Sequence, residues 1–458
     1  MFIDSHAHLD MSDFDADRHR VLERAQTSDI GHIITVGYDL ISSKKALQIA
    51  QSIPIVSATV GIHPHDAKIA TEPVCEEIKQ LAEESGAVAI GEIGLDYYRN
   101  LSPREMQREA FLRQIRIANE LKLPIVVHIR DAYPDALQIL KDEKASLQGG
   151  VIHCFSGDSQ DASRFLELGY YISLAGPLTY PKSETLRQVA KEVPIERLMI
   201  ETDCPYLPPQ PYRGKRNEPA YVLEVAKKLA ELKGLSFEDV GRITSLNVFK
   251  LFGIGNNPEE GKISYKIRNS TYLNITNKCS NSCSFCVRST TPFVKGHHLT
   301  LARDPSLEEV WQAIGDPSDS DEVVFCGLGE PLIRLDIVKE ISGRLKAKSI
   351  KVRVNSNGQA NLIHGRNILP ELAGLIDEIS ISLNAQDEGT YHRICNSQSG
   401  ETAFQAIKEF ILEAKKFIPQ VGVTALNGLP GVDIKRCREI AEKELGVSFR
   451  ERKYNEVG

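Results

Sequence analysis

Residues 2–10 read FIDSHAHLD, a short apolar run that ends in two histidines separated by a single residue. Seven more runs of this kind follow, over residues 32–37, 55–61, 87–92, 124–128, 151–153, 170–174 and 198–201. Amphipathic stretches separate them, so strands and helices alternate. Eight such strands within about 250 residues predict a (β/α)8 TIM barrel of the α/β class. An open Rossmann-like sheet is the alternative, but no glycine-rich phosphate loop follows an early strand.

The clearest helix of this half is predicted over residues 103–122. It is preceded by Ser102-Pro103-Arg104-Glu105, which has the spacing of a capping box with proline at the first helical position.

Metal-binding side chains recur where the predicted strands end. His6 and His8 are two apart on an extended chain, so both rings can reach one ion. Barrel strands converge at their carboxyl ends, where active sites form. Six candidate ligands collect at this rim: His6, His8, Glu92, His128, His153 and Asp203. A lone histidine at a strand end is usually structural, but four histidines and two carboxylates at one mouth predict a site for two divalent cations, with Glu92 able to bridge them.

The motifs around these residues resemble the TatD deoxyribonuclease family. They read SHAHLD, GIHPH, GEIGLDYY, VVHIRDA, IHCFSG and ETDCPYL, in this order, and span essentially all of residues 1–254. The resemblance implies one metal on His6, His8, Glu92 and Asp203, and a second on Glu92, His128 and His153. It also implies that Asp203 takes the proton of the attacking water and that His63 lies near the scissile phosphate. In the loop PYRGKRNEP, three basic residues are candidates for holding a phosphate, although such a run is often only a solvated loop: Arg213, Lys215 and Arg216.

Paired cations would activate water near neutral pH and bind the oxygens of a phosphoryl group. Bound cations would also attract a nucleic acid, which the formal net charge of -7 does not. We therefore expect a nuclease that acts on DNA or RNA ends with two Mg, Mn or Zn ions. The alternative is a deacylase or amidohydrolase, for example on aminoacyl-tRNA, because the same water can attack carbon.

Glycine, asparagine and proline cluster in GIGNNPEEG, residues 253–261, which reads as a linker. We place a hydrolase domain at 1–254, a linker at 255–265 and a second domain at 266–458.

Helices are predicted in the second domain over 307–314 and 403–417. Its strands are predicted over 271–276, 322–325, 351–355, 378–383, 421–425 and 447–450. Six βα units favour an open, partial (β/α)6-type barrel over a closed one.

Three of the nine cysteines fall within eight residues, in the CxxxCxxC motif formed by Cys279, Cys283 and Cys286. Three thiolates can hold three irons of a [4Fe–4S] cluster and leave the fourth iron open. A structural zinc knuckle completed by His297 or His298 is the alternative, but a second cysteine pair is missing. Cys326, Cys395 and Cys437 stand apart in the sequence, so a second cluster is not expected.

This spacing at the start of a partial barrel is similar to the radical S-adenosylmethionine superfamily. CGLGEP at 326–331 resembles the family's GGE motif, with Leu328 in place of a glycine, and NSNG and SISLNA occupy later matching positions. The resemblance implies S-adenosylmethionine as cofactor and a reductant such as flavodoxin or ferredoxin as partner. Its candidate cofactor contacts are Gly327, Gly329, Glu330, Asn355, Ser382 and Asn384. The alternative is an iron–sulfur electron-transfer or binding module, and the substrate is not evident.

The first ten residues lack the basic start and apolar core of a signal peptide, and no run is long enough to span a membrane. We expect a cytoplasmic protein without disulfides and without a membrane partner.

Overall fold

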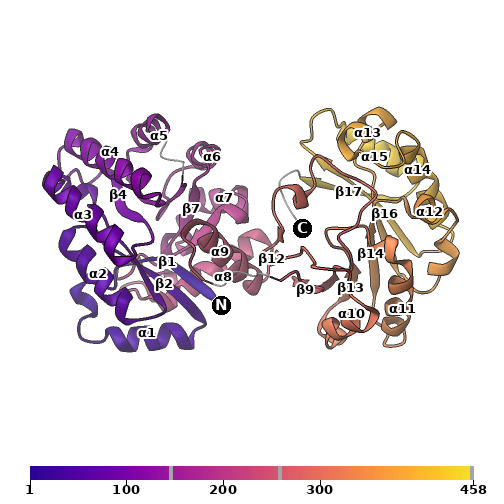
Figure 1. Cartoon of the computed structure of the whole chain (residues 1–458), viewed down its shortest axis with the longest axis horizontal. Helices are drawn as coiled ribbons and strands as arrows, with labels where there is room; N and C mark the ends of the chain where they lie inside the picture. Colours follow the sequence, from indigo (N-terminus) through magenta and orange to yellow (C-terminus); the bar gives the residue numbers. More distant parts are fainter. Residues whose placement is uncertain (144–147, 256–259, 454–458) are drawn as a thin grey trace. The chain divides into compact units, whose positions relative to one another are not determined.

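The structure is a computed structural model, and it describes residues 1–143, 148–255 and 260–453. The chain forms two compact units, Met1–Asn257 and Pro258–Gly458 (Figure 1). Part of the predicted linker, residues 256–259, lies outside the described residues. Strand β9 begins at Ser264, so the end of that predicted linker already belongs to the sheet of the second unit.

The first unit contains eight parallel strands in chain order. Each expected apolar run forms a strand: β1 Phe2–Ala7, β2 Ile30–Val36, β3 Val56–Thr59, β4 Ile90–Asp96, β5 Ile125–Arg130, β6 Gly150–Ile152, β7 Tyr171–Leu174 and β8 Leu198–Ile200. Strands β1–β3 and β4–β8 pair as two groups. Parallel bridges from Val60 to Ile90 and from Ala7 to Cys204 join the groups at both ends. The predicted (β/α)8 barrel is thereby confirmed.

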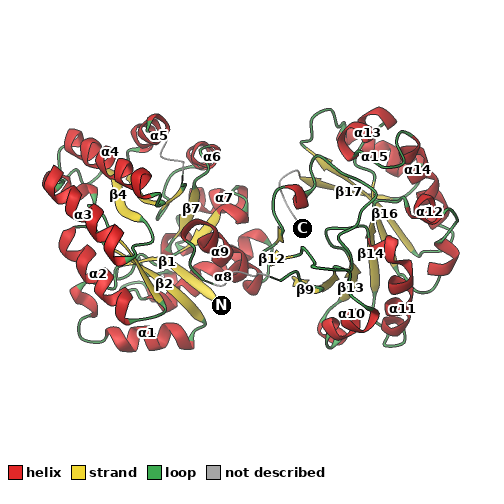
Figure 2. Ribbon diagram, viewed as in Figure 1, coloured by secondary structure: helices red, strands yellow, loops and turns green. Residues whose placement is uncertain are grey.

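Helices follow the strands and cover the outside of the barrel, as Figure 2 shows for α1 to α4. Their bounds are α1 Arg18–Thr27, α2 Leu40–Ser52, α3 Glu72–Ser85, α4 Arg104–Leu121, α5 Tyr133–Asp142, α6 Ser159–Glu167, α7 Glu184–Glu192, α8 Val222–Lys233 and α9 Phe237–Phe252. The core between strands and helices is built from buried aliphatic and aromatic residues such as Phe111, Ile115 and Val127. This packing fixes the carboxyl ends of the strands, where the candidate ligands lie.

The capping box predicted ahead of α4 is wrong. Pro103 is the N-cap rather than the first helical residue, and no side chain caps the helix. The hydroxyl of Ser102 instead donates a hydrogen bond to the carbonyl of His65 at 2.7 Å. A tertiary contact to the 3-10 helix Pro64–Ile69 has replaced the local one.

The second unit is an open sheet covered by helices. Its strand order is β17-β16-β15-β14-β13-β10-β9, and all neighbours are parallel except β9 and β10. The six expected strands are β10 Ser270–Leu273, β13 Glu322–Phe325, β14 Val352–Ser356, β15 Glu378–Ser382, β16 Gln420–Asn427 and β17 Ser448–Lys453. The partial barrel is therefore confirmed. Unpredicted strands are β9 Ser264–Ile267 and the hairpin formed by β11 Phe293–Val294 and β12 His297–His298.

The helices of this unit are α10 Leu307–Ile314, α11 Leu335–Lys346, α12 Ala360–His364, α13 Glu388–Cys395, α14 Thr402–Ala414 and α15 Ile434–Glu439. Helix α10 has the expected bounds and a complete capping box between Ser306 and Glu309. None of the helices in the described residues is both long and apolar enough to cross a bilayer.

Candidate functional site

All six predicted ligands of the first unit lie together, and all but Glu92 lie in the carboxyl half of a barrel strand or just after it. His6 belongs to β1 and His8 follows it, and both rings are buried. Their Nε2 atoms are 3.3 Å apart, and each lies within 4 Å of Asp203 Oδ1. Two imidazole nitrogens and a carboxylate oxygen that converge in this way are the donor set of a divalent cation.

Glu92, near the start of β4, stands in the middle of this group. Its Oε2 faces the first histidine pair, 3.6 Å from His6 Nε2 and 3.8 Å from His8 Nε2. Its Oε1 faces the second pair, 2.9 Å from His128 Nδ1 and 2.7 Å from His153 Nε2. Each oxygen of the Glu92 carboxylate thus lies near a different pair of histidine nitrogens.

Two further carboxylates contact the ring nitrogens of these histidines that point away from Glu92. Asp96 Oδ2 lies 3.3 Å from His128 Nε2 and 2.8 Å from His65 Nε2. Glu201 Oε1 lies 3.3 Å from His153 Nδ1. Such partners fix the orientation of a ligand ring and raise its basicity. The sequence analysis missed them, although Asp96 is four residues after Glu92 on the same strand face and Glu201 ends β8.

The electrostatics of the site keep its carboxylates ionised. Burial alone would raise the pKa of Glu92, but the charge of His153 and of the other rings holds that pKa well below its ordinary value. Burial also disfavours the charged form of His8, yet the hydrogen bond and charge of Asp203 raise the pKa of His8 to about 9. The site therefore holds ionised carboxylates among its imidazole rings.

His63 caps the short 3-10 helix Pro64–Ile69 and accepts a hydrogen bond from the backbone of His65 through Nδ1. Its Nε2 lies 3.5 Å from Glu92 Oε1, so the ring belongs to the second histidine pair's side of the site. Burial lowers the pKa of His63 to about 4, which leaves the ring neutral at pH 7.

Glycine at position 94 allows β4 and β5 to approach each other beside the site. Its φ is +140°, and a Cβ there would lie 2.0 Å from the carbonyl oxygen of His128. Only glycine fits this conformation and this contact, so Gly94 helps to place His128 opposite Glu92.

The basic loop does not present three free cations. Arg216 forms a two-pronged ion pair with Asp17, at 2.8 Å from each nitrogen, and donates to the carbonyl of Asp13. Arg216 is thus already paired with a carboxylate, and its contact with a phosphate stays a prediction. Arg213 stacks over Tyr180 and Lys215 is exposed, so these two residues stay candidates.

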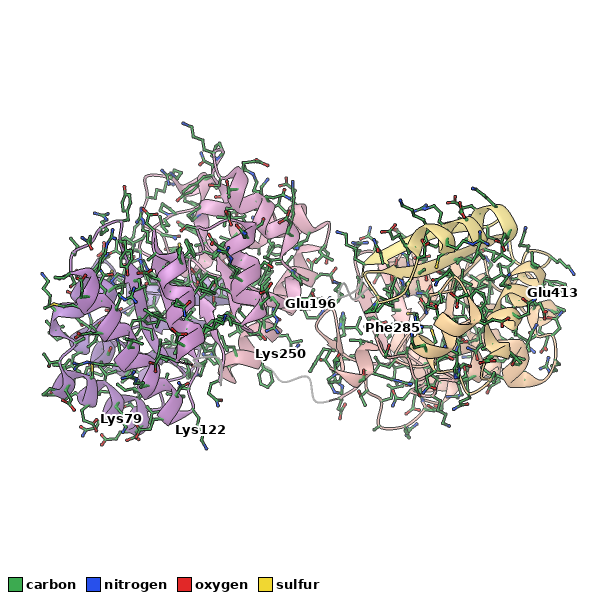
Figure 3. All side chains as sticks on the ribbon, turned by 90° about the horizontal axis from the view of Figure 1, so that it is seen from above. Lys79, Lys122, Glu196, Lys250, Phe285 and Glu413 are labelled. Atoms are coloured by element: carbon green, nitrogen blue, oxygen red, sulfur yellow. The ribbon has the colours of Figure 1, made fainter. Side chains whose placement is uncertain are left out.

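In the second unit, Cys279, Cys283 and Cys286 follow β10 on a loop, here called the cysteine loop (279–286). Its Phe285 is labelled in Figure 3. Backbone hydrogen bonds fasten this loop to the end of α13: Ser282 N donates to Cys395 O at 3.1 Å, and Ser284 N donates to Ile394 O at 2.9 Å. The loop is therefore anchored at the carboxyl edge of the sheet, with its three thiols half-buried.

Cys395 is not isolated, as the sequence had suggested. Its thiol lies against that of Cys283, and this contact together with burial raises the pKa of Cys283. A tetrahedral zinc site would bring four donor atoms within about 4 Å of one another. Within the described residues, the clusters of three or more donors this close all belong to the first unit, and none includes His297 or His298. The zinc knuckle stays the alternative to an iron–sulfur cluster on the three cysteines.

The glycines of CGLGEP pack this segment against the root of the cysteine loop. A Cβ at Gly327 would lie 2.1 Å from Asn274 Oδ1, and one at Gly329 would lie 2.4 Å from Thr276 O. The following Glu330 is buried, and its backbone N–H donates to Lys278 O at 2.8 Å.

The carboxylate of Glu330 accepts from the backbone of Asn357 and Leu332 and from the hydroxyl of Ser356. Asn357 Nδ2 lies 3.8 Å from Cys279 Sγ. The amide beside the cysteine loop is therefore Asn357, which the sequence analysis did not select, whereas the predicted Asn355 accepts from Arg353.

Two further predicted cofactor contacts lie at the end of β15 and just beyond it. Ser382 is half-buried there. Asn384 is buried, its Nδ2 lies 3.8 Å from Cys395 Sγ, and its Oδ1 has no hydrogen-bond partner among the described residues. A buried amide oxygen without a donor fits a position that a bound cofactor completes.

Comparison with known proteins assigns both units. Residues 3–253 match the model of TatD-related DNases, and residues 273–443 match the radical SAM superfamily. The metal-dependent hydrolase YabD of Bacillus subtilis, described as uncharacterized, is 43% identical over 254 residues, which cover 56% of this chain and all of that protein. The 3′-5′ ssDNA/RNA exonuclease TatD of Citrobacter rodentium is 38% identical over 251 residues, 54% of this chain and 95% of that protein.

A solved structure shares the fold of the first unit. The TatD homologue YJJV from Escherichia coli K12 aligns with a TM-score of 0.53 at 30% identity, over 56% of this chain and 98% of that chain.

Proposed function

This chain belongs to the TatD-related DNase family and also carries a radical SAM domain, and from that premise we propose that its first unit hydrolyses phosphodiester bonds at DNA or RNA ends. The observation that carries the proposal is the position of Glu92, whose two oxygens face two separate histidine pairs. The exonuclease name of the Citrobacter relative supports nucleic acid as the substrate class.

The residues divide into two ligand sets that share Glu92. His6, His8 and Asp203 form the first set, and His128 and His153 form the second. When bound there, two divalent cations would supply a water of lowered pKa and positive charge for the phosphoryl oxygens. The buried His6 Nδ1, which has no hydrogen-bond partner among the described residues, and the converging Nε2 atoms fit such an occupant.

Asp203 has a second role beside that of ligand. It is the proton acceptor for the attacking water, since nearby rings lower its pKa and so keep it ionised. Other side chains act on the substrate. His63 stays neutral and donates a hydrogen bond to the phosphate from Nε2. Arg213 and Lys215 are exposed and supply positive charge to the departing strand.

For the second unit, we propose a radical SAM enzyme whose cluster is held by Cys279, Cys283 and Cys286. When bound there, such a cluster would leave one iron open for S-adenosylmethionine and would supply the electron for its reductive cleavage, which also releases methionine. Glu330 and Asn357 position the cofactor's polar groups, because both lie beside the cysteine loop. A flavodoxin or ferredoxin is the expected reductant.

An end-labelled substrate tests the first proposal. The full chain, supplied with Mn²⁺, should release nucleotides from single-stranded DNA or RNA, and Asp203→Asn should lose at least about 100-fold in kcat. Asp142→Asn, an exposed aspartate, is the matched control. If the protein releases no nucleotides but deacylates aminoacyl-tRNA, the deacylase replaces the nuclease.

The second proposal is tested on the same anaerobic preparation. Four irons and four sulfides per chain, with 5′-deoxyadenosine formed after reduction, are expected. Stoichiometric zinc without sulfide would establish a knuckle instead.

A further inference from the structure

The two faces of the second unit's sheet differ in polarity. Residues such as Val323, Val354 and Ile381 point to the helix-covered face and belong to the core. Their neighbours along the strands, which point the other way, are polar. They line a cavity of about 490 Å³ on the opposite face, toward the amino ends of the strands, with Ser380, Thr424 and Ser448 among its hydroxyls. This volume is that of a small-molecule site.

Most charges around this cavity are already paired. Arg353 Nη2 lies 2.6 Å from Glu322 Oε1, and Lys351 Nζ lies 2.8 Å from Glu378 Oε2. These pairs leave Arg450 as the cation of the cavity without a counter-ion among residues 1–143, 148–255 and 260–453.

Arg452 lies next to Arg450 and is a second positive charge without a counter-ion among the described residues. It is two residues from Arg450 on β17, so both side chains leave the strand on the same face. Within the part of the chain that the structure describes, Arg452 has neither an ion pair nor a hydrogen bond, and its Nε is wholly buried. The thiols of Cys326 and Cys283 are near enough to act on its charge, which places it on the side of the cysteine loop.

A half-buried arginine with a buried Nε that lacks a partner is costly, and a ligand can supply the missing anion. Asp321 is the cavity's carboxylate without an ion pair among the described residues, and it precedes β13, four strands from β17 in the sheet. It is therefore not placed to neutralise the arginines, and the β17 side of the cavity carries the excess positive charge.

We propose that Arg450 and Arg452 bind an oxyanion group, a phosphate or a carboxylate, of the molecule on which the second unit acts. This inference rests on the proposed radical SAM function, since it takes the cavity to be that unit's substrate site. The planar forks of two arginines match the oxygens of either group. The remainder of the substrate is polar and lies against the hydroxyls of the cavity, which Arg450 lines and which Arg452 adjoins on the side of the cysteine loop.

The chain offers its own reporter for this site, because its single tryptophan, Trp311, lies in α10 of the second unit. Thermal unfolding of the full chain, followed by Trp311 fluorescence, is measured with inorganic phosphate, with succinate, and with NaCl at equal ionic strength. At about ten times its Kd, the bound oxyanion should raise the midpoint by about 3 °C. A rise with phosphate alone identifies a phosphate site, and a rise with succinate alone a carboxylate site.

The variants Arg450→Gln and Arg452→Gln should each remove this rise. Arg436→Gln, which loses the same charge from an exposed ion pair on α15, should keep it. Without oxyanion, Arg452→Gln should unfold no earlier than wild type, since it removes an unpaired charge. An equal rise in all four proteins, or no rise in wild type with either anion, overturns the proposal. A rise that depends on Arg450 and Arg452 in a protein that never forms 5′-deoxyadenosine would keep the oxyanion site and refute the radical function.

Discussion

At the scale of single residues, the candidate ligands of the first unit depend on carboxylates that do not themselves face the centre. Asp96 contacts the outer nitrogens of both His65 and His128 and is almost fully buried. Burial alone would raise its pKa, but hydrogen bonds from His128 and His65 hold that pKa far below its ordinary value. Asp96 is thus an anion that orients a ligand ring, and its removal should loosen the ring without removing a ligand.

We expect Asp96→Asn to weaken metal binding about 10- to 100-fold, because an amide holds the outer nitrogen of His128 less firmly. At saturating metal, kcat should stay within a few-fold of wild type. Metal titrations of hydrolysis measure both quantities. Asp142→Asn serves as control, and an unchanged metal affinity of the Asp96 variant would exclude the orienting role.

Glu330 provides a pH-dependent test in the second unit. Burial raises its pKa to about 7 from an ordinary 4.5. The folded state therefore binds a proton more tightly than the unfolded state, and the free energy of unfolding should fall as pH rises from about 4.5 to 7. Integrated over this window the loss is on the order of 3 kcal/mol.

This loss should be visible in urea unfolding followed by Trp311 fluorescence at pH 5 and pH 8, without cofactor. Glu330→Gln should flatten the pH dependence, whereas the exposed Glu388→Gln should leave it intact. An identical slope in wild type and Glu330→Gln would show that another group carries it.

The ligands could be predicted from the sequence because each one ends a recognisable apolar run. Their outer partners could not, since a carboxylate such as Glu201 gains its role only when β6 and β8 lie near each other. The ion pair of Arg216 could not be predicted for the same reason: its partner Asp17 is 199 residues away in the chain. Cys395 likewise meets Cys283 only after α13 has packed beside the cysteine loop.

At the scale of elements, β4 and β5 must lie close together for Glu92 to face His128. Gly94 permits this approach through its positive φ and missing side chain. The same strand also carries Asp96, which orients the ring of His128. A shift of β4 would therefore move both Glu92 and Asp96.

Gly94→Ala should destabilise the first unit by about 3 kcal/mol or more, because backbone strain and a clash with the carbonyl of His128 add together. Gly86→Ala is the matched control: its φ is +70°, but nothing lies within 4 Å of the added Cβ. That variant should lose only about 1 kcal/mol. Scanning calorimetry measures both, and equal losses would mean that strain alone, not the strand contact, requires Gly94.

Most strands and helices could be predicted from the spacing of apolar residues, because each of these elements buries one apolar face. Local signals gave wrong predictions where a residue distant in the sequence supplied the hydrogen-bond partner. Ser102 bonds to His65 instead of capping α4. The short strands β9, β11 and β12 lacked a visible pattern, since two to four residues are too few to show alternation.

At the scale of the whole molecule, each unit has its own hydrophobic core and its own candidate site. A substitution in one unit should therefore abolish the activity of that unit and leave the activity of the other unit intact. Cys279→Ala should lose the iron–sulfur cluster and 5′-deoxyadenosine formation while nuclease activity stays within two-fold of wild type, and Asp203→Asn should do the reverse. Iron and sulfide counts with both assays on each variant measure this. Loss of both activities in either variant would indicate that the two sites depend on each other.

The central claim is that Glu92 joins two metal ions in one hydrolytic site. Electron paramagnetic resonance of the Mn²⁺-loaded full chain tests it most directly, because two bridged Mn²⁺ ions are magnetically coupled and a single ion is not. Wild type should bind two Mn²⁺ and show the coupled spectrum together with nucleotide release. Glu92→Gln should lose both the coupling and the activity. A wild-type protein that is fully active with one uncoupled Mn²⁺ per chain would contradict the two-metal account.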